Sequence, residues 1–314
     1  MGATDHNATW PGPVRRPPER MGLIAGWGRF PLAVARALRR QGSRTYCLGV
    51  VGHADPGLAE LCHDFRTSGL ARFGGAVRYF QRHGVTDAVL AGKIHKRLLF
   101  QPWFVLRHLP DLRTVRAFLP HFLTKQKDCK DDSLLLAVVD LFGSEGIRVG
   151  PATDYAPELL VKAGRLTRRE PSSSQSKDIR FGWEIAKQMG RLDVGQSVAV
   201  KNRAVLAVEA VEGTDECIRR AGALCPAGEF TVVKVAKPQQ DMRFDVPTVG
   251  LGTLETMVAS GARVLAVEAG MTILLDQEEF VDFANRNKRV VVAIEDPTAR
   301  PGDLAPPADR ANEP

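Results

Sequence analysis

The 314-residue sequence predicts an α/β protein of two domains, and three observations lead to this class. Val- and Ala-rich segments of strand length alternate with helical patterns over the first 150 residues, which is typical of a parallel sheet with crossover helices. Residues 151–176 are rich in Pro, Ser and basic side chains, and a second alternation with a β-hairpin pattern follows them. We expect disordered tails at 1–20 and 298–314, an N-terminal domain at 21–150, a linker at 151–176 and a C-terminal domain at 177–297.

Composition excludes several classes of protein. The net charge of +7 favours anionic partners, such as phosphorylated ligands, nucleic acid or an anionic membrane surface. Five scattered cysteines without a CxxC pair indicate reduced thiols, and seven histidines without an HExxH pattern argue against a zinc site. The sequence contains neither a run of about 18 apolar residues nor a signal peptide. We therefore expect a cytoplasmic protein.

The N-terminal domain begins with a strand, a glycine turn and a helix. An apolar strand near 21–25 precedes Gly26 and Gly28, and Pro31 suits the first turn of the following helix. Glycines at this place let backbone N–H groups approach an anion, although the full GxGxxG pattern is absent. Gly26 and Gly28 are therefore candidate ligand-binding residues, and a turn that only packs closely is the alternative.

Strands at 45–51 and 87–91, with a helix at 74–83 between them, extend this pattern to a Rossmann-like parallel sheet. Lys93 follows the strand at 87–91, and open α/β sheets bind ligands at the carboxyl ends of their strands. Lys93 is thus a candidate ligand contact, with a solvated lysine cluster as the alternative.

Two further segments of this domain carry open interpretations. Residues 98–127 are apolar and aromatic with interspersed Arg and Lys, which suits either contact with lipid or burial in the domain core. Asp131 and Asp132 open an apolar helix, where we expect an N-cap and keep a catalytic or metal role as the other candidate.

In the C-terminal domain, acidic residues follow predicted strands. Glu209 and Glu268 each end a Val-rich strand in Val-Glu-Ala, so a carboxylate emerges where a loop begins. Ligand contact and structural pairing with a basic residue are both open for them. Between these strands, Thr214 or Asp215 is expected to cap a helix.

The segment 234–250 follows a buried Val-rich strand and displays polar residues at intervals: Lys237, Gln240, Asp241, Arg243 and Asp245. Pro238 and Pro247 exclude a helix, so we expect extended backbone. Cations beside carboxylates indicate phosphate and metal chemistry, because Lys and Arg bind phosphoryl oxygens and Asp binds a hard divalent ion. A salt-bridged strand edge is the alternative.

Seven motifs in order carry a family resemblance: Leu23-Ile-Ala-Gly-x-Gly-x-x-Pro31, Asp131-Asp-x-Leu-Leu135, Asp193-Val-Gly-Gln196, Val208-Glu-Ala-x-Glu-Gly-Thr-Asp215, Lys234-x-Ala-Lys-Pro-x-Gln240, Arg243-x-Asp-x-Pro-Thr-x-Gly250 and Val267-Glu-Ala-Gly270. Together they resemble the UDP-2,3-diacylglucosamine pyrophosphatases of the LpxI type in bacterial lipid A biosynthesis. The resemblance covers residues 21–296.

The resemblance implies a Mg²⁺-dependent hydrolase with its ligand cleft between the two domains. Water would attack the α-phosphorus of UDP-2,3-diacylglucosamine and give UMP and 2,3-diacylglucosamine 1-phosphate (lipid X). The essential aspartate of the family falls on Asp245, in metal binding or water activation, and the further metal candidates are Glu209, Asp215 and Glu268. Lys237, Gln240 and Arg243 would bind phosphoryl oxygens. The implied substrate-binding residues are Gly26, Gly28, Lys93, Gln196, Gly213, Thr214, Lys237, Gln240, Arg243 and Thr248.

The same resemblance implies a peripheral protein at the inner face of the cytoplasmic membrane, with residues 98–127 as candidates for receiving the acyl chains. Homo-oligomerisation stays open. A non-catalytic nucleotide- or lipid-binding protein on the same fold is the main rival hypothesis. Nucleic-acid binding, suggested by the basic pI, lacks an aromatic RNP pattern or a recognition helix, and we expect no nucleic-acid partner.

Overall fold

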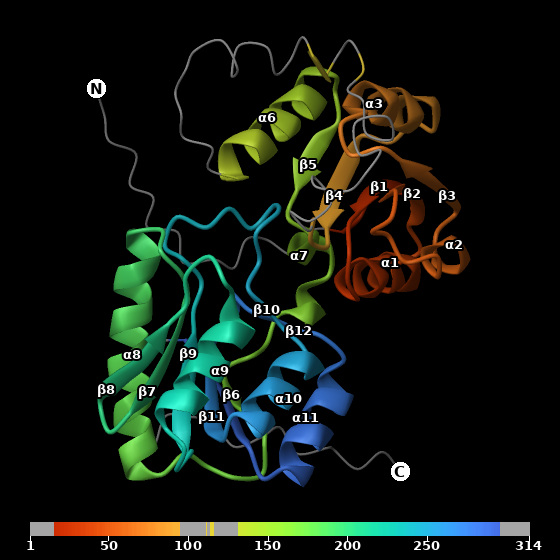
Figure 1. Cartoon of the computed structure of the whole chain (residues 1–314). Coiled ribbons are helices and arrows are strands. Elements are labelled where there is room, and N and C mark those ends of the chain that lie inside the picture. Colours follow the sequence, from red (N-terminus) through yellow and green to blue (C-terminus); the bar gives the residue numbers. More distant parts are fainter. Residues whose placement is uncertain (1–15, 95–110, 112–113, 116–130, 296–314) are drawn as a thin grey trace, which may run out of the picture. The chain divides into compact units, whose positions relative to one another are not determined.

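The computed structural model describes residues 16–94, 111, 114–115 and 131–295, which form two compact units (Figure 1). The N-terminal unit contains the described residues up to Pro157 together with Asp241–Asp245. The C-terminal unit contains Glu158–Gln240 and the described residues from Val246 onward. The predicted α/β class with two distinct sheet domains is confirmed. The predicted ligand cleft between the domains stays a prediction.

The N-terminal unit is built on a parallel sheet in the order β3-β2-β1-β4-β5. Its strands are β1 (Arg20–Ala25), β2 (Arg44–Val50), β3 (Asp64–Ser68), β4 (Asp87–Ala91) and β5 (Arg148–Gly150). Its helices are α1 (Phe30–Arg40), α2 (Leu58–Leu61), α3 (Phe73–Arg82), α6 (Asp131–Ser144) and α7 (Ala152–Tyr155). From β1 the chain first adds strands on one side, β2 and β3, and then on the other side, β4 and β5. The topological switch point therefore lies between β1 and β4, and the ligand-binding crevice of a Rossmann-like sheet is expected at their carboxyl ends.

Helices α3 and α6 cover one face of this sheet, and α1 lies on the other side (Figure 1). Phe80 of α3 and Phe142 of α6 are fully buried against the sheet residues Ala88 and Val149. The sequence analysis did not predict β3. Its sequence, Asp-Phe-Arg-Thr-Ser, is polar because β3 is an edge strand with little burial.

The C-terminal unit contains a six-stranded mixed sheet in the order β6-β13-β11-β9-β7-β8. Strands β9 (Phe230–Lys234), β11 (Ala262–Glu268) and β13 (Val290–Ile294) are parallel. Strands β6 (Gly164–Arg165), β7 (Ser197–Lys201) and β8 (Ala204–Val208) pair antiparallel to their neighbours. A separate parallel pair joins β10 (Thr248–Val249) to β12 (Ile273–Leu274).

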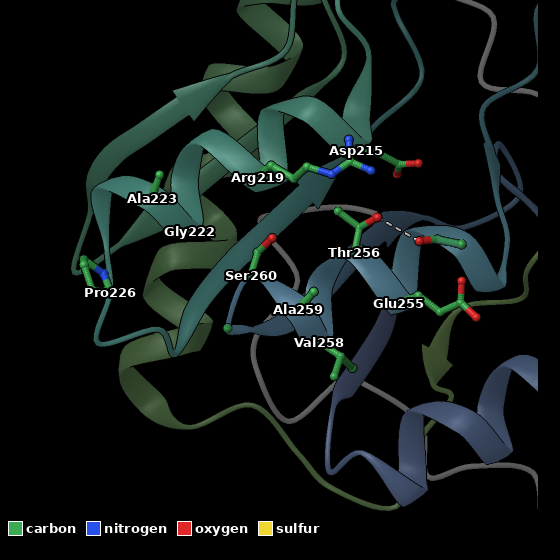
Figure 2. Close-up of a pocket in the computed structure, with 12 residues that line it drawn as sticks. Asp215, Arg219, Gly222, Ala223, Pro226, Glu255, Thr256, Val258, Ala259 and Ser260 are labelled. Carbon is green, nitrogen blue, oxygen red and sulfur yellow. Dashed lines mark hydrogen bonds between the residues drawn. The ribbon is translucent and has the colours of Figure 1, made fainter.

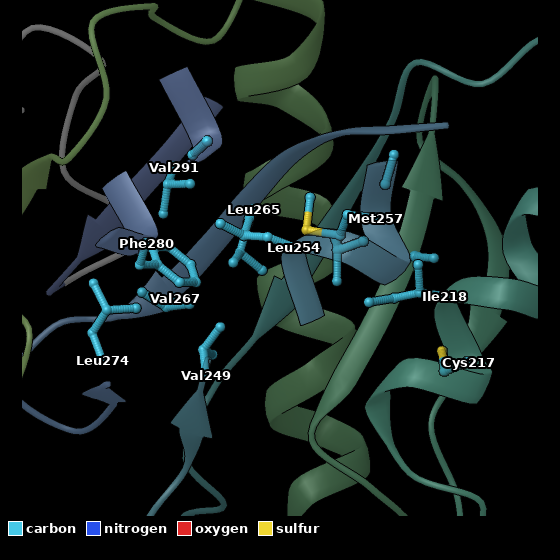
Figure 3. Packing of buried hydrophobic residues seen from close by; sticks show 14 of the residues in the cluster. Cys217, Ile218, Val249, Leu254, Met257, Leu265, Val267, Leu274, Phe280 and Val291 are labelled. Atoms are coloured by element: carbon cyan, nitrogen blue, oxygen red, sulfur yellow. The ribbon is translucent and has the colours of Figure 1, made fainter. Parts of the chain in front are cut away.

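Both faces of the larger sheet are covered by helices. On one face lies α8 (Ser173–Arg191), whose N-terminus has the capping box of Ser172 and Gln175. Gly182 lets α8 approach the sheet, because a Cβ there would lie 2.8 Å from the Val233 side chain. On the other face lie α9 (Thr214–Leu224), α10 (Leu251–Ala259) and α11 (Gln277–Arg286). Figure 3 shows Leu254, Met257 and Phe280 of these helices packed on Leu265 and Val267 of β11.

Residues 151–176 differ from the predicted linker. They contain α7, a 3-10 turn at Pro157–Leu159, strand β6 and the first residues of α8. β6 pairs with β13, so this part of the segment belongs to the sheet of the C-terminal unit. A strand of only two residues has no alternation that a sequence pattern could reveal.

Several predictions fall on residues that the structure does not describe. The predicted tails lie largely outside the described residues, and so does most of the segment 98–127. Among the described helices, none has the length and apolar character needed to cross a membrane.

Candidate functional site

Gly26, Gly28 and Lys93 come together at the carboxyl ends of β1 and β4. The Gly26 N–H donates to the Ala91 carbonyl (2.8 Å), and Trp27 and Lys93 exchange two backbone hydrogen bonds of 2.8 and 2.9 Å. A Cβ at Gly26 would lie 2.8 Å from the Lys93 carbonyl oxygen, so only glycine fits there. These N–H groups are thus used by the backbone, which agrees with the packing interpretation of Gly26.

Gly28 and Lys93 are more open. Gly28 has a φ of 106°, and a Cβ built on it would meet nothing within 4 Å. The Lys93 side chain is exposed at the same strand edge. Asp131 and Asp132 begin α6, and their side chains lie outside what the structure describes. Ligand binding by this edge stays a prediction.

Most candidates of the C-terminal unit lie at one edge of its sheet. Lys234, the last residue of β9, pairs with Ser197 of β7 and with Val267 of β11. Because β8 runs antiparallel to β7, Val208 lies opposite Val198, and Glu209 follows at the same edge. Gln196 and Glu268 adjoin this row of residues. The strand registers therefore gather side chains from β7, β8, β9 and β11.

A buried polar network connects three of these elements. The Lys234 ammonium donates to the Thr214 hydroxyl (2.9 Å), and the Thr214 hydroxyl donates to the Glu209 carboxylate (3.0 Å). Ser197 Oγ lies 3.3 Å from the same hydroxyl. All four side chains are more than nine-tenths buried. Glu209 Oε2 and Gln196 Oε1 are buried too, and neither atom has a hydrogen-bond partner among the described residues. Burying such groups is costly unless they are hydrogen-bonded, so these atoms mark a place for water or a ligand donor.

The cap of α9 differs from the expectation. Gly213, with a φ of 88°, is the N-cap residue, and no side chain caps this end of the helix. The Thr214 hydroxyl is drawn into the buried network instead. Asp215 accepts a hydrogen bond from Thr253 Oγ1 (3.0 Å) and so connects α9 with α10.

Glu268 forms a partly buried ion pair. Both of its carboxylate oxygens accept from Lys187 Nζ, at 2.7 and 2.6 Å, and Oε2 also accepts from the Ala236 N–H at 2.7 Å. The Lys187 ammonium lies 5.6 Å from the centre of the Trp183 ring. This is the structural pairing that the sequence left open, and it occupies the carboxylate that was a metal candidate.

The loop between β9 and β10 is not extended as predicted. The chain makes turns in which the Gln240 N–H donates to the Lys237 carbonyl (3.0 Å) and the Asp245 N–H donates to the Asp241 carbonyl (3.0 Å). The Asp241 carboxylate accepts from the Arg243 N–H (3.0 Å), and this local bond favours a turn over a strand. The prolines exclude a helix, as expected, but they do not exclude turns.

The polar residues of this loop differ in their partners. Arg243 Nε donates to both oxygens of Asp241 at 2.9 and 3.0 Å, and Lys237 Nζ contacts Asp193 at 2.8 Å. Burial alone would raise the pKa of Asp241, but the hydrogen bonds and charge of Arg243 hold it below its usual range. Gln240 Oε1 accepts from the Lys237 N–H, while its buried Nε2 has no partner in the part of the chain that the structure describes. Within the described chain, the half-buried Asp245 side chain makes no hydrogen bond or ion pair.

Comparison with known proteins decides the family. The model of the LpxI N-terminal domain matches residues 20–159, and that of the LpxI C-terminal domain matches residues 162–292. The chain belongs to the LpxI family. It is 30% identical over 289 residues to the UDP-2,3-diacylglucosamine pyrophosphatase LpxI of Caulobacter vibrioides, covering 90% of this chain and 99% of that protein.

Among solved structures, the biotin carboxylase domain of Hydrogenobacter thermophilus 2-oxoglutarate carboxylase matches with 12% identity and a TM-score of 0.24. The match covers 66% of this chain and 41% of that one, and this weak likeness carries no argument.

The acidic side chains of the described residues bear on the predicted magnesium. No group of three His, Cys, Asp or Glu side chains that could hold a metal ion forms within the described residues. Three of the predicted ligands already have partners: Glu209 accepts from Thr214, Asp215 accepts from Thr253, and Glu268 pairs with Lys187. Mg²⁺ commonly takes only one or two carboxylates and completes its shell with water and substrate phosphates. The available carboxylate of Asp245 fits such a site, and the metal itself stays a prediction.

A surface pocket with a volume of about 880 Å³ lies between α9 and α10 of the LpxI C-terminal domain (Figure 2). Arg219 and Glu255 line it together with small residues such as Gly222 and Ser260. Of the predicted site residues in the described chain, Asp215 alone lines this pocket. The pocket is therefore distinct from the strand edge that gathers the other candidates.

Sequence reasoning missed three polar residues of this edge: Lys187, Ser197 and Lys234. Lys234 begins both the segment 234–250 and one of the seven motifs, but the sequence analysis assigned it no role. The available signal was a charged residue inside an otherwise apolar strand, Phe-Thr-Val-Val-Lys, because a buried lysine requires partners.

Proposed function

We propose that this LpxI-family protein hydrolyses the pyrophosphate of UDP-2,3-diacylglucosamine to UMP and lipid X. The relative from Caulobacter carries the name of this activity and matches over nearly its whole length. The observation that carries the proposal is that the Asp245 carboxylate is available to bind a ligand. Its carboxylate is half-buried and makes no ion pair within the described residues, whereas Asp241, four residues earlier, is held by Arg243.

The proposed reaction is a displacement at the α-phosphorus. The water oxygen bonds to the α-phosphorus, the bond from that phosphorus to the bridging oxygen breaks, and lipid X leaves with the bridging oxygen. Asp245 either holds the Mg²⁺ or accepts the proton of the attacking water. The chemistry that Mg²⁺ supplies when bound is neutralisation of charge on the phosphoryl oxygens.

Lys237, Gln240 and Arg243 are proposed to bind those phosphoryl oxygens. Lys237 and Arg243 contact Asp193 and Asp241 in this structure, so a phosphate has to share or replace these carboxylates. Charge-assisted bonds to phosphate are strong enough to make such an exchange feasible. Gln196, Gly213, Thr214 and Thr248 stay proposed substrate contacts at the same sheet edge.

The substrate also bears on where the protein acts. A lipid with two acyl chains resides in a membrane, and a protein with a net charge of +7 is attracted to an anionic surface. We propose peripheral association with the inner face of the cytoplasmic membrane. Homo-oligomerisation stays open, and no nucleic-acid partner is proposed.

The deciding experiment measures UMP release from UDP-2,3-diacylglucosamine in water enriched in ¹⁸O, with Mg²⁺ or with a chelator. Attack on the α-phosphorus places the ¹⁸O in UMP, whereas label in lipid X would mean attack on the β-phosphorus. Asp245→Asn should remove nearly all turnover and leave the melting temperature unchanged, because a half-buried carboxylate with no ion pair among the described residues contributes little to the fold. Asp282→Asn, on the exposed surface of α11, is the matched control.

Absence of UMP release from the wild-type protein under all metal conditions would favour the rival hypothesis. In that case the protein binds the nucleotide or the lipid without turning it over. Binding of substrate by calorimetry would then be retained in the same preparation.

A further inference from the structure

Lys234 is a buried lysine at the base of the loop that carries Asp245. Its side chain is 6% exposed, and lysine is almost never so deeply buried unless its ammonium group is bound by partners. The ammonium donates to the Thr214 hydroxyl (2.9 Å) and to the Thr248 carbonyl (3.3 Å). Burying a charged ammonium group costs desolvation free energy, and a hydrophobic residue could fill this position of β9 without that cost. The charge of Lys234 is therefore expected to have a role of its own.

These two contacts connect Lys234 with both ends of the loop. The loop leaves β9 after Lys234 and enters β10 at Thr248, so the contact with the Thr248 carbonyl joins its first and last residues. Each end has a separate anchor: the Val235 N–H donates to the Gln196 carbonyl (3.0 Å), and Thr248 pairs with Ile273 of β12. The ammonium group therefore connects two anchored strands at the base of the loop.

The hydrogen-bond directions in the network follow from counting protons. Lysine can only donate, and the Thr214 hydroxyl has a single proton, which it gives to Glu209. Thr214 consequently accepts from Lys234, and the neighbouring Ser197 hydroxyl has to donate to it. The network thus has one direction, from the ammonium through the hydroxyl to the carboxylate, and the Glu209 carboxylate is fixed by it.

We propose that Lys234 is a positioning residue, which closes the base of the loop 234–248 and, through the Thr214 hydroxyl, fixes the Glu209 carboxylate at the same edge. The inference rests on the proposed function in one respect, since the loop carries Asp245. A displacement of about 1 Å at a reacting group costs about 100-fold in rate, so a loosened loop lowers kcat. Lys234 itself touches no reacting atom in this proposal.

The test compares Lys234→Met, which keeps the length of the side chain and removes its charge, with Lys201→Met. Lys201 lies on β7 of the same sheet and binds the Gly228 carbonyl (2.5 Å) at the opposite edge. We expect Lys234→Met to lower kcat by about 100-fold with KM changed by less than about threefold. The loosened loop misplaces Asp245, and the loss of an interaction made only in the transition state lowers kcat while KM stays nearly constant. Lys201→Met should keep the kcat and KM of the wild type.

Hydrogen exchange provides a readout independent of activity. In Lys234→Met, the amides of residues 235–247 should exchange faster, while those of β11 keep their protection. If the wild-type protein shows no turnover but the loop of Lys234→Met still exchanges faster than that of the wild type, this inference stands and only the proposed function is refuted. Unchanged loop exchange in Lys234→Met would overturn the inference, whatever its turnover.

The single variant Thr214→Val covers the case in which Lys234→Met does not fold, and a double-mutant cycle of the two substitutions applies where it does fold. Thr214→Val removes the bridging hydroxyl at nearly constant volume and should also lower kcat and loosen the loop. Because both residues act in one network, the double variant should be no slower than Lys234→Met alone. The proposal would be overturned if the decreases in kcat of the two single variants multiply in the double variant. It would also be overturned if Thr214→Val keeps the kcat and the loop exchange of the wild type. The buried Thr256→Val, whose hydroxyl binds the Gly252 carbonyl of its own helix, is the control for losing a buried hydroxyl.

Discussion

Glu268→Gln should destabilise the C-terminal unit while leaving the reaction largely intact. The substitution keeps the shape of the side chain and removes the charge that pairs with Lys187. The Lys187 ammonium then keeps the Ala236 carbonyl (3.1 Å) and the Trp183 ring as partners, but loses its carboxylate. The prediction separates the two interpretations that the sequence left open for Glu268.

The expected magnitude follows from the burial of the pair. Removing one partner of a fully buried ion pair costs about 3–5 kcal/mol. Here the Lys187 and Glu268 side chains keep 23% and 12% of their exposure, so solvent screens part of the interaction. We therefore expect a loss of about 2–3 kcal/mol. For a unit of this size, such a loss corresponds to a decrease in melting temperature of about 5–10 °C.

The assay is urea unfolding followed by circular dichroism, together with turnover measured well below the transition. Glu216→Gln on α9 is the control, because its pair with Arg219 is exposed and should contribute less than about 1 kcal/mol. Unchanged stability of Glu268→Gln together with lost turnover would refute the reasoning. That result would assign Glu268 to the substrate or a metal ion.

Three further predictions follow from the described contacts. Because Arg243 lowers the pKa of Asp241, this carboxylate should stabilise the fold above its unfolded pKa of about 3.9 and lose that contribution as the pH falls through its lower folded value. Asp241→Asn should flatten the pH dependence of unfolding in this acidic window. Phe280→Ala should cost about 3–5 kcal/mol in urea unfolding, since the ring is 1% exposed in the core, and an equally stable variant would contradict this packing. A chelator should stop UMP release without lowering the melting temperature, because Mg²⁺ commonly takes only one or two carboxylates and completes its shell with water and substrate phosphates.

The N-terminal half of the fold was predictable because its signals are local. A glycine turn after an apolar strand and Pro31 at the helix start indicated β1 and α1, and the structure places Pro31 in the first turn of α1. The strand at 87–91 was also predicted with the bounds that β4 has. The polar edge strand β3 has no apolar alternation, so no pattern in the sequence distinguished it from a loop.

The candidate site was predictable in its residue types and only partly in their contacts. The sequence indicated that Glu209 and Glu268 end strands, yet the partner of Glu268 is Lys187, 81 residues earlier on α8. Such a long-range pair depends on the tertiary packing of α8 against the sheet and leaves no local pattern. The same holds for Lys234, whose partners come from α9 and β10.

The division of the chain has a consequence for dissecting this protein into fragments. Residues Asp241–Asp245 belong to the N-terminal unit, with Phe244 packed against its core, although they lie far along the chain. A cut between Pro157 and Glu158 would leave this pentapeptide on the wrong fragment. Neither half expressed alone would possess a complete N-terminal unit, so activity should return only when the two fragments reassemble. The chain therefore cannot be divided at this point into two fragments that each contain a complete unit, even though it folds around two sheets.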